Sequence, residues 1–125
     1  MNGLTLDAGA LIGLERKDVR TLALVRSATR RNLLITVPAP VVVEWWRGQR
    51  GPVAKLIDDF VVEPLSYDLA RLAGEALGRC AKGPSSTDAV VMASAAQRGD
   101  VVVTGDLEDL TRLQTCFPAV RLLRV

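Results

Sequence analysis

The chain has 125 residues, of which 49% are hydrophobic and 24% are charged, and its formal net charge is +2. This length predicts a single domain spanning residues 1–125, and the composition is typical of a globular protein rather than a disordered one. The longest uncharged stretch, Asn32 to Val43, contains two prolines and is shorter than the roughly 20 apolar residues that a membrane-spanning helix needs. No contact with a membrane is therefore expected.

The sequence contains no histidine and only two cysteines, Cys80 and Cys116. This excludes a Ser-His-Asp triad and a zinc site of the usual Cys/His kind. A bound metal must then be a hard cation with oxygen ligands, which points to Mg²⁺ or Mn²⁺. The cysteines fit no metal-ligand spacing, and we expect them to be reduced core residues of a cytoplasmic protein. No basic segment precedes the first apolar stretch, which contains Asp7, so no signal peptide is expected.

Short β-branched runs alternate along the chain with segments of helical periodicity. Strands are expected at Leu4–Leu6, Leu33–Val37, Phe60–Val62, Val101–Thr104 and Val120–Val125. Helices are expected from Ala8, at Val19–Arg30, from Pro40, at Val53–Asp59, at Tyr67–Cys80, around Asp88 and after Asp106. This alternation predicts a single-domain α/β/α sandwich with a mainly parallel sheet of about five strands.

Four acidic residues lie where such a fold places its ligands. Asp7 and Asp106 directly follow predicted strands, whereas Glu44 and Asp88 lie near the starts of predicted helices. In a parallel α/β sheet these positions share one edge. Crowded carboxylates repel one another and raise their pKa values, and a divalent cation removes that repulsion. One or two Mg²⁺ or Mn²⁺ ions held in this way are what metal-assisted phosphodiester hydrolysis requires.

Each of these acids also has an ordinary structural explanation. Asp7 and Asp106 are well placed to cap the helices that follow them. Asp109 follows Asp106 at capping-box spacing, and Asp88 follows Ser85 at the same spacing. Taken one at a time, these residues are as well explained by helix capping as by metal binding.

The stretch VPAPVVVEWWRG raises two further alternatives. Glu44 can pair with Arg47 on the solvent-facing side of a helix, or it can lie in an apolar environment where a cation must compensate its charge. Trp45 and Trp46 suit packing in the core or in a dimer interface better than the stacking of RNA bases. The arginine-rich stretch Arg26–Asn32 is more typical of a solvated helix end than of an RNA-contacting patch.

Four motifs occur in a characteristic order, namely LTLDAGALIGLE, VPAPVVVEWWRG, STDAVVMASA and GDVVVTGD. Over essentially the whole chain they resemble the PIN-domain nucleases, and specifically the short VapC-type toxins of prokaryotic toxin–antitoxin pairs. The resemblance implies the following catalytic and metal-binding acids, with a supplementary acid and a supporting hydroxyl: Asp7, Glu44, Asp88 and Asp106, then Asp109, then Thr104.

The same resemblance implies a PIN-like fold and Mg²⁺- or Mn²⁺-dependent endonucleolytic cleavage of RNA. The implied partners are a VapB-type antitoxin, which blocks the site, and a second copy of the chain in a homodimer. One departure is that Ala8-Gly9 replaces a stretch that often carries a hydroxyl or amide side chain in the family. The alternative is a catalytically weak or inactive PIN-like module that acts through protein or RNA binding.

A phosphoacceptor receiver domain also gathers acids at the end of a parallel sheet, but it requires paired acids after the first strand and a lysine after a late strand. Here Asp7 stands alone, and the lysines are Lys17, Lys55 and Lys82, none of which follows a late strand. The receiver interpretation is therefore disfavoured.

Overall fold

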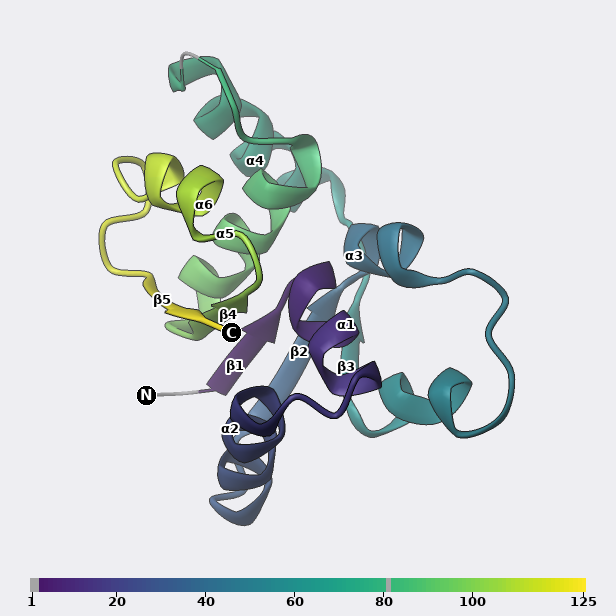
Figure 1. Ribbon diagram of the computed structural model, residues 1–125. Coiled ribbons are helices and arrows are strands. Elements are labelled where there is room, and N and C mark those ends of the chain that lie inside the picture. Colours follow the sequence, from purple (N-terminus) through teal and green to yellow (C-terminus); the bar gives the residue numbers. More distant parts are fainter. Residues whose placement is uncertain (1–2, 81) are drawn as a thin grey trace.

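The computed structural model describes residues 3–80 and 82–125. Within these ranges, strands and helices alternate along the chain as the sequence predicts (Figure 1). The elements are β1 Gly3–Leu6, α1 Ala8–Glu15, α2 Val19–Arg30, β2 Leu34–Pro38, α3 Ala39–Trp45, the 3₁₀ helix η1 Gly51–Asp59, β3 Val61–Glu63, α4 Tyr67–Arg79, α5 Ser86–Arg98, β4 Val101–Thr104, α6 Leu107–Leu113 and β5 Arg121–Arg124.

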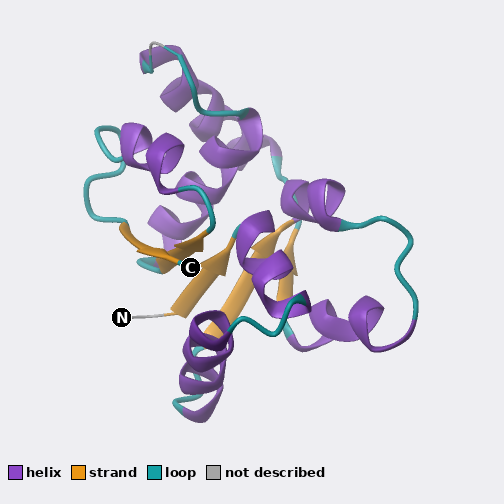
Figure 2. Ribbon diagram, viewed as in Figure 1, coloured by secondary structure: helices purple, strands orange, loops and turns teal. Residues whose placement is uncertain are grey.

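The strands form one sheet in the order β3-β2-β1-β4-β5, and every pairing in it is parallel. The central strand β1 pairs Leu4 with Ile35 of β2 on one side and with Val101 of β4 on the other. Parallel neighbours need crossover connections, and these are the helices, which lie on both sides of the sheet (Figure 2). The predicted α/β class with a mainly parallel sheet is confirmed, and the sheet is in fact wholly parallel.

The two helical layers differ in how they cover the sheet. Helices α1 and α2 pack against one face of the sheet, whereas α5 packs against β1, β2 and β4 on the other face. Helices α4 and α6 pack in turn against α5. Leu6, Val37 and Val102 in the sheet are fully buried, and so are Leu11 of α1 and Met92 of α5, which cover the sheet from its two faces. Valine-rich strands buried on both faces are what an all-parallel sheet requires.

One segment differs from the sequence prediction in type, and several elements differ from it at their ends by a residue. The segment predicted as a helix at Val53–Asp59 is a 3₁₀ helix that begins at Gly51. Gly51 has a positive φ of 70° and Pro52 follows it, and with nine residues the segment is longer than most 3₁₀ helices. Strand β3 begins one residue later than predicted and ends at Glu63.

Several smaller expectations are also resolved. Cys80 and Cys116 are free thiols, half-buried beside the core rather than fully inside it. Trp45 is 2% exposed and belongs to the core, whereas Trp46 is 44% exposed. The arginines of Arg26–Asn32 are exposed at the end of α2. Among the helices of residues 3–80 and 82–125, none is long and apolar enough to cross a membrane.

Candidate metal centre

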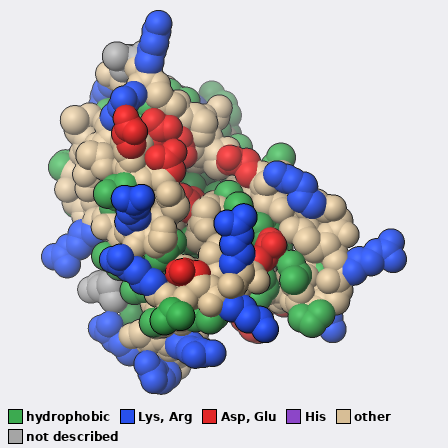
Figure 3. Space-filling view, viewed as in Figure 1, with side chains coloured by type: hydrophobic (Ala, Val, Ile, Leu, Met, Phe, Trp, Pro, Cys, Tyr) green, Lys and Arg blue, Asp and Glu red, His purple; other side chains and the backbone are tan. Residues whose placement is uncertain are grey.

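A pocket of about 440 Å³ opens at the carboxyl edge of the sheet, and all five predicted acids line it. The chain leaves β1 toward β2 on one side and leaves β4 toward β5 on the other, so the connections reverse direction between β1 and β4. Such a switch point is where open α/β sheets bind ligands. Acidic side chains gather on this face, and lysine and arginine side chains lie around them (Figure 3). The pocket lining consists of Asp7, Ala8, Gly9, Glu44, Ser85, Thr87, Asp88, Gly105, Asp106 and Asp109.

Asp7 forms the buried floor of this pocket. It follows β1, is 9% exposed, and caps α1 by accepting a hydrogen bond from the Ala10 N–H at 2.9 Å. The Thr104 hydroxyl donates to the other carboxylate oxygen, and the Gly105 N–H approaches the first oxygen at 3.4 Å. The capping explanation of Asp7 is therefore correct, but capping uses only part of the carboxylate's accepting capacity.

The electrostatic environment of Asp7 is unfavourable for a charge. Burial raises the pKa of the Asp7 carboxyl above its ordinary value, and the nearby charge of Asp88 raises it further. Hydrogen bonds from Thr104, Ala10 and Gly105 oppose this rise in the pKa without cancelling it. A buried carboxyl whose charged form is penalised in this way is the kind of group that a bound cation would stabilise.

Asp88 lies in the first turn of α5 and completes a capping box. Its carboxylate accepts from the Ser85 N–H at 2.9 Å, and the Ser85 hydroxyl accepts from the Asp88 N–H at 3.1 Å. The predicted capping box therefore exists. Its bond to the backbone uses Oδ2 of Asp88, and the residue still lines the pocket, so capping and ligand binding are compatible here.

Asp106 and Asp109 come from the other side of the switch point. Asp106 is exposed at the N-cap position of α6, yet its side chain makes no capping hydrogen bond. The alternative explanation of Asp106 as a cap of α6, with Asp109 as its capping-box partner, is therefore not realised. The Asp106 N–H instead donates to the Thr104 hydroxyl at 2.8 Å, which leaves its carboxylate free to face the pocket.

Glu44 is placed differently from the prediction. It lies in the last turn of the seven-residue helix α3 rather than near its start, because the chain leaves the helix at Trp46 and Gly48 follows with a φ of 74°. Its side chain is exposed, so no apolar burial needs compensation. The alternative pairing with Arg47 is not formed either, and the Arg47 guanidinium instead donates to the carbonyl of Trp46 at 3.0 Å. Glu44 nevertheless lines the acidic pocket, at an exposed position.

The acids of this pocket have no positively charged partner within residues 3–80 and 82–125. The ion pairs of that part of the chain join Arg98 to Glu63 and Asp100, and Arg112 to Glu108. The donor set, five carboxylates and several hydroxyls, matches the oxygen ligands that Mg²⁺ and Mn²⁺ take. As the described side chains stand, however, no three of them converge closely enough to ligate one ion. The pocket therefore fits such an ion in its chemistry, and ligation requires side-chain rotation within it.

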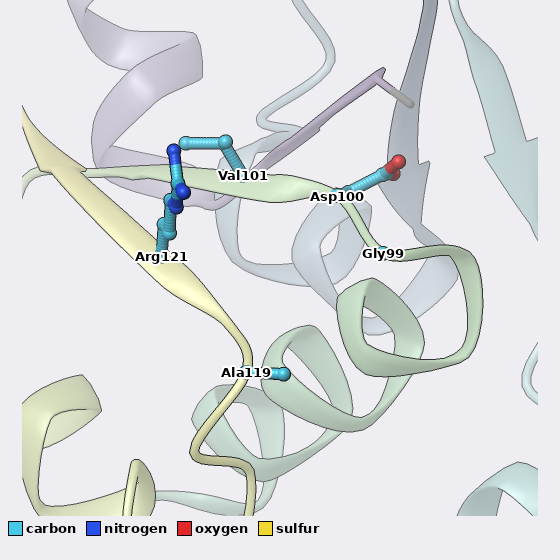
Figure 4. Close-up of a pocket in the computed structure, with 5 residues that line it drawn as sticks. All are labelled: Gly99, Asp100, Val101, Ala119 and Arg121. Carbon is cyan, nitrogen blue, oxygen red and sulfur yellow. The ribbon is translucent and has the colours of Figure 1, made fainter. Parts of the chain in front are cut away.

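A second pocket, of about 200 Å³, lies at the opposite edge of the sheet (Figure 4). Gly99, Asp100, Val101, Ala119 and Arg121 line it. Its carboxylate, Asp100, is already bound to Arg98 at 2.9 Å, so this pocket lacks the excess negative charge of the first.

Sequence reasoning missed one feature of the acidic pocket. The backbones of Gly9 and Gly105 touch, and a Cβ atom built on Gly9 would lie 2.7 Å from the Gly105 Cα. The departure at Ala8-Gly9 thus has a structural counterpart, namely a direct contact between the first turn of α1 and the turn after β4. The available signal was a glycine two residues after Asp7 and another directly before Asp106.

The topology and the acidic pocket together define an α/β protein of PIN-like fold, as the motifs predict. No protein-family model and no curated protein matches the sequence. Solved structures do match it over nearly the full length of both chains. VapBC2 from Rickettsia felis, in a structure bound to a DNA fragment from its promoter, matches with a TM-score of 0.73 and 12% identity over 98% of this chain and 98% of that chain.

Two further structures show the same fold. DNA-bound VapBC from Salmonella typhimurium matches with a TM-score of 0.73 and 19% identity over 99% of this chain and 98% of that chain. FitAcB from Neisseria gonorrhoeae matches with a TM-score of 0.70 and 16% identity over 96% of both chains. At these identities the likeness establishes the fold, which is the PIN-like fold that the motifs predict.

Proposed function

We propose that this protein is a Mg²⁺- or Mn²⁺-dependent endoribonuclease and the toxin of a VapBC-type toxin–antitoxin pair. The observation that carries the proposal is the pocket itself. Five carboxylates from separate parts of the chain line one pocket at the topological switch point, and no cationic side chain of the described residues neutralises them. A pocket of this kind is suited to a divalent cation and, through it, to a phosphodiester.

The protein's own residues have distinct tasks in this scheme. A bound cation supplies an activated water and neutralises charge that develops on the phosphate. Asp7, Glu44, Asp88 and Asp106 hold the cation, with Asp109 as a supplementary ligand. Thr104 orients the Asp7 carboxylate through its hydroxyl and anchors the Asp106 backbone on the same oxygen. The N-terminus of α5, beside Asp88, favours the approach of a phosphate.

The proposed partners follow from the solved structures of the same fold. Those structures are of VapBC and FitAB proteins, and we extend that pairing to this chain by assigning it a VapB-type antitoxin that covers the acidic pocket. A homodimer is proposed from apolar side chains that remain exposed, among them Val43 at 78% and Trp46 at 44%. The site of action is the cytoplasm, where the RNA substrate is found.

One observation favours the second candidate, a weak or inactive PIN-like module. The carboxylates do not converge on one point in the structure, and Ala8-Gly9 offers no side-chain hydroxyl or amide beside Asp7. Such a protein would keep its antitoxin and would bind RNA without cleaving it. Catalysis in the purified protein distinguishes the two candidates.

The decisive experiment compares Asp7→Asn and Asp88→Asn with the unmodified protein. With Mn²⁺ present, we expect both substitutions to abolish RNA cleavage while circular dichroism shows an unchanged fold. Mn²⁺ at a hundred times its dissociation constant stabilises the unmodified protein by about 2.7 kcal/mol, and this gain is lost in both variants. The matched control is Asp58→Asn, an exposed acid of η1 that does not line the pocket. Undiminished cleavage in both purified pocket variants would refute the assignment.

A further inference from the structure

The contact between α1 and the turn after β4 is made by backbone alone. A Cβ on Gly9 would lie 2.7 Å from the Gly105 Cα and 2.8 Å from the Gly105 nitrogen, distances that real Cβ atoms essentially never show. In the reverse direction, a Cβ on Gly105 would lie 3.0 Å from the Gly9 Cα. The obstacle in both cases is backbone, which cannot rotate away as the end of a flexible side chain can.

This contact lies where the two sides of the acidic pocket are joined. The Gly105 N–H points to the Asp7 carboxylate at 3.4 Å, and a Cβ on Gly9 would be 3.3 Å from the same Asp7 oxygen. One residue earlier, the Thr104 hydroxyl donates to Asp7, and one residue later the Asp106 N–H donates back to that hydroxyl. A side chain at Gly9 would therefore be wedged between Asp7 and the turn that carries Asp106.

From this geometry we infer that Gly9 is a positioning residue, whose missing side chain lets the turn after β4 close onto Asp7 and so sets the separation of Asp7 and Asp106. The inference rests on the proposed function in that these two acids are assigned to one cation. Gly9 contributes no ligand. It acts through Gly105, whose N–H lies 3.4 Å from the Asp7 carboxylate.

Gly9 differs from the other helical glycines in what surrounds it. Its φ is not positive, so no backbone conformation requires glycine there. Gly13, in the same helix, faces the Thr21 side chain, with its Cβ position 2.6 Å from the Thr21 hydroxyl oxygen and away from the pocket. Gly74 in α4 has nothing within 4 Å. These two glycines are matched controls, one for steric pressure on α1 and one for the change of helix propensity alone.

The test substitutes each glycine by alanine and measures two quantities on the full chain. Isothermal titration gives the Mn²⁺ affinity, and amide hydrogen exchange by NMR gives the protection of the Gly105 and Asp106 N–H groups. For Gly9→Ala we expect the affinity to fall by about tenfold or more, as for other supporting partners of metal ligands. Protection of these two amides falls more than that of core amides. Gly13→Ala lowers protection everywhere without a selective loss of affinity, and Gly74→Ala leaves both quantities unchanged.

Two outcomes overturn the inference. One is a folded Gly9→Ala protein with unchanged Mn²⁺ affinity and unchanged protection of the turn. The other is an equal loss of affinity in Gly13→Ala, which would make the effect general to α1. If Gly9→Ala does not fold, Gly105→Ala applies the same pressure more mildly and is judged by the same criteria.

RNA cleavage is measured separately in the same samples. If the unmodified protein binds Mn²⁺ but cleaves no RNA, the proposed function fails while the affinities still decide the role of Gly9. If the unmodified protein binds no Mn²⁺, the metal site fails, and the exchange data alone decide whether Gly9 closes the turn onto Asp7.

Discussion

Two clusters of carboxylates lie in this small protein, and they are built on opposite principles. On the α5 side of the sheet, Arg98 binds Asp100 at 2.9 Å and Glu63 at 3.0 Å, and its guanidinium also donates to the hydroxyls of Thr5 and Ser94, both at 2.8 Å. In the pocket at the carboxyl edge, Asp7 is similarly buried but receives hydrogen bonds only from neutral donors.

The two clusters differ in what compensates the charge of a buried carboxylate. Asp100 is 4% exposed, but Arg98 and the Thr5 hydroxyl both donate to it, so the fold itself compensates its burial. Asp7 is 9% exposed, and its burial raises the pKa of its carboxyl, while the residues that the structure describes place no cationic side chain in an ion pair with it. Burial alone does not distinguish the two acids, whereas the source of the compensating charge does.

The largest expected effect on stability comes from removing the Arg98 guanidinium, which compensates the charges of Asp100 and Glu63. Arg98→Met leaves the Asp100 carboxylate buried with the Thr5 hydroxyl as a remaining donor, and it releases Glu63 as well. Breaking a fully buried pair destabilises a protein by about 3 kcal/mol, and we expect a somewhat smaller loss here because the Arg98 side chain is 24% exposed. Urea denaturation measures the change in the free energy of unfolding.

The control for this prediction is Glu108→Gln, which removes the exposed i,i+4 pair of Glu108 with Arg112. Pairs of that kind contribute about 0.5 kcal/mol or less. Mn²⁺ affinity is expected to survive both substitutions, since neither residue lines the pocket. A loss of stability in Arg98→Met no larger than that of the control would show that the network does not compensate Asp100.

Much of the fold was predictable from the sequence, because its strands are short, valine-rich and buried on both faces. The run Val101–Thr104 was predicted with its final bounds, and so was the amphipathic helix Val19–Arg30. The 3₁₀ helix at Gly51–Asp59 was not distinguished from an α-helix, since over so short a segment the two share nearly the same apolar spacing. Boundaries elsewhere moved by a residue where packing, rather than composition, ends the element.

The site was predictable to the extent that topology determines it. Strand ends in a parallel sheet share one edge, so Asp7 and Asp106 were expected to meet, and both line the pocket. Which acids cap a helix was not predictable. Ser85-x-x-Asp88 and Asp106-x-x-Asp109 have the same spacing, but only the first forms a capping box. The Gly9 contact depends on three-dimensional proximity, which no local pattern encodes.

The Arg98 network was also missed, although the sequence held a signal for it. Asp100 directly precedes four buried residues of β4, and a carboxylate at such a position needs a partner. Arg98 stands two residues earlier, across the αL glycine Gly99 that ends α5 with a φ of 71°. The sequence gives no sign that Glu63 joins this network. Its carboxylate binds the same guanidinium from the edge strand β3.

A smaller effect is expected from the capping box that the pocket shares with α5. Ser85→Ala removes the hydroxyl that accepts from the Asp88 N–H and costs about 1 kcal/mol of stability. Because Asp88 also lines the pocket, we expect Mn²⁺ affinity to fall a few-fold as the first turn of α5 loosens. The matched control is Ser66→Ala, which removes the equivalent cap of α4, an element that does not line the pocket. An equal effect of both substitutions on affinity would remove Asp88 from the site.

The smallest expected change in stability comes from a substitution at Asp7, and it tests directly whether this acid lacks a compensating charge. The carboxyl of an unfolded aspartate has a pKa near 3.8, and burial raises the pKa of Asp7 above it in the folded protein. Between these two pH values the folded state binds more protons than the unfolded state, so this group's contribution to stability falls as pH rises through the window. Asp7→Asn lacks the charge and should be the more stable protein at neutral pH in the absence of metal. The gain in stability is limited because the asparagine amide is a weaker acceptor than a carboxylate for the hydrogen bond from the Thr104 hydroxyl.

This prediction is checked by urea denaturation of both proteins in metal-free buffer from pH 3 to pH 7. The advantage of Asp7→Asn should be smallest below pH 3.8 and grow as pH rises, because only the unmodified protein acquires a buried charge. Saturating Mn²⁺ should then reverse the order at neutral pH, since the cation stabilises only the protein that keeps its carboxylate. An advantage for asparagine that is independent of pH would show that Asp7 is compensated within the fold, as Asp100 is. In that case the distinction between the two clusters would not hold.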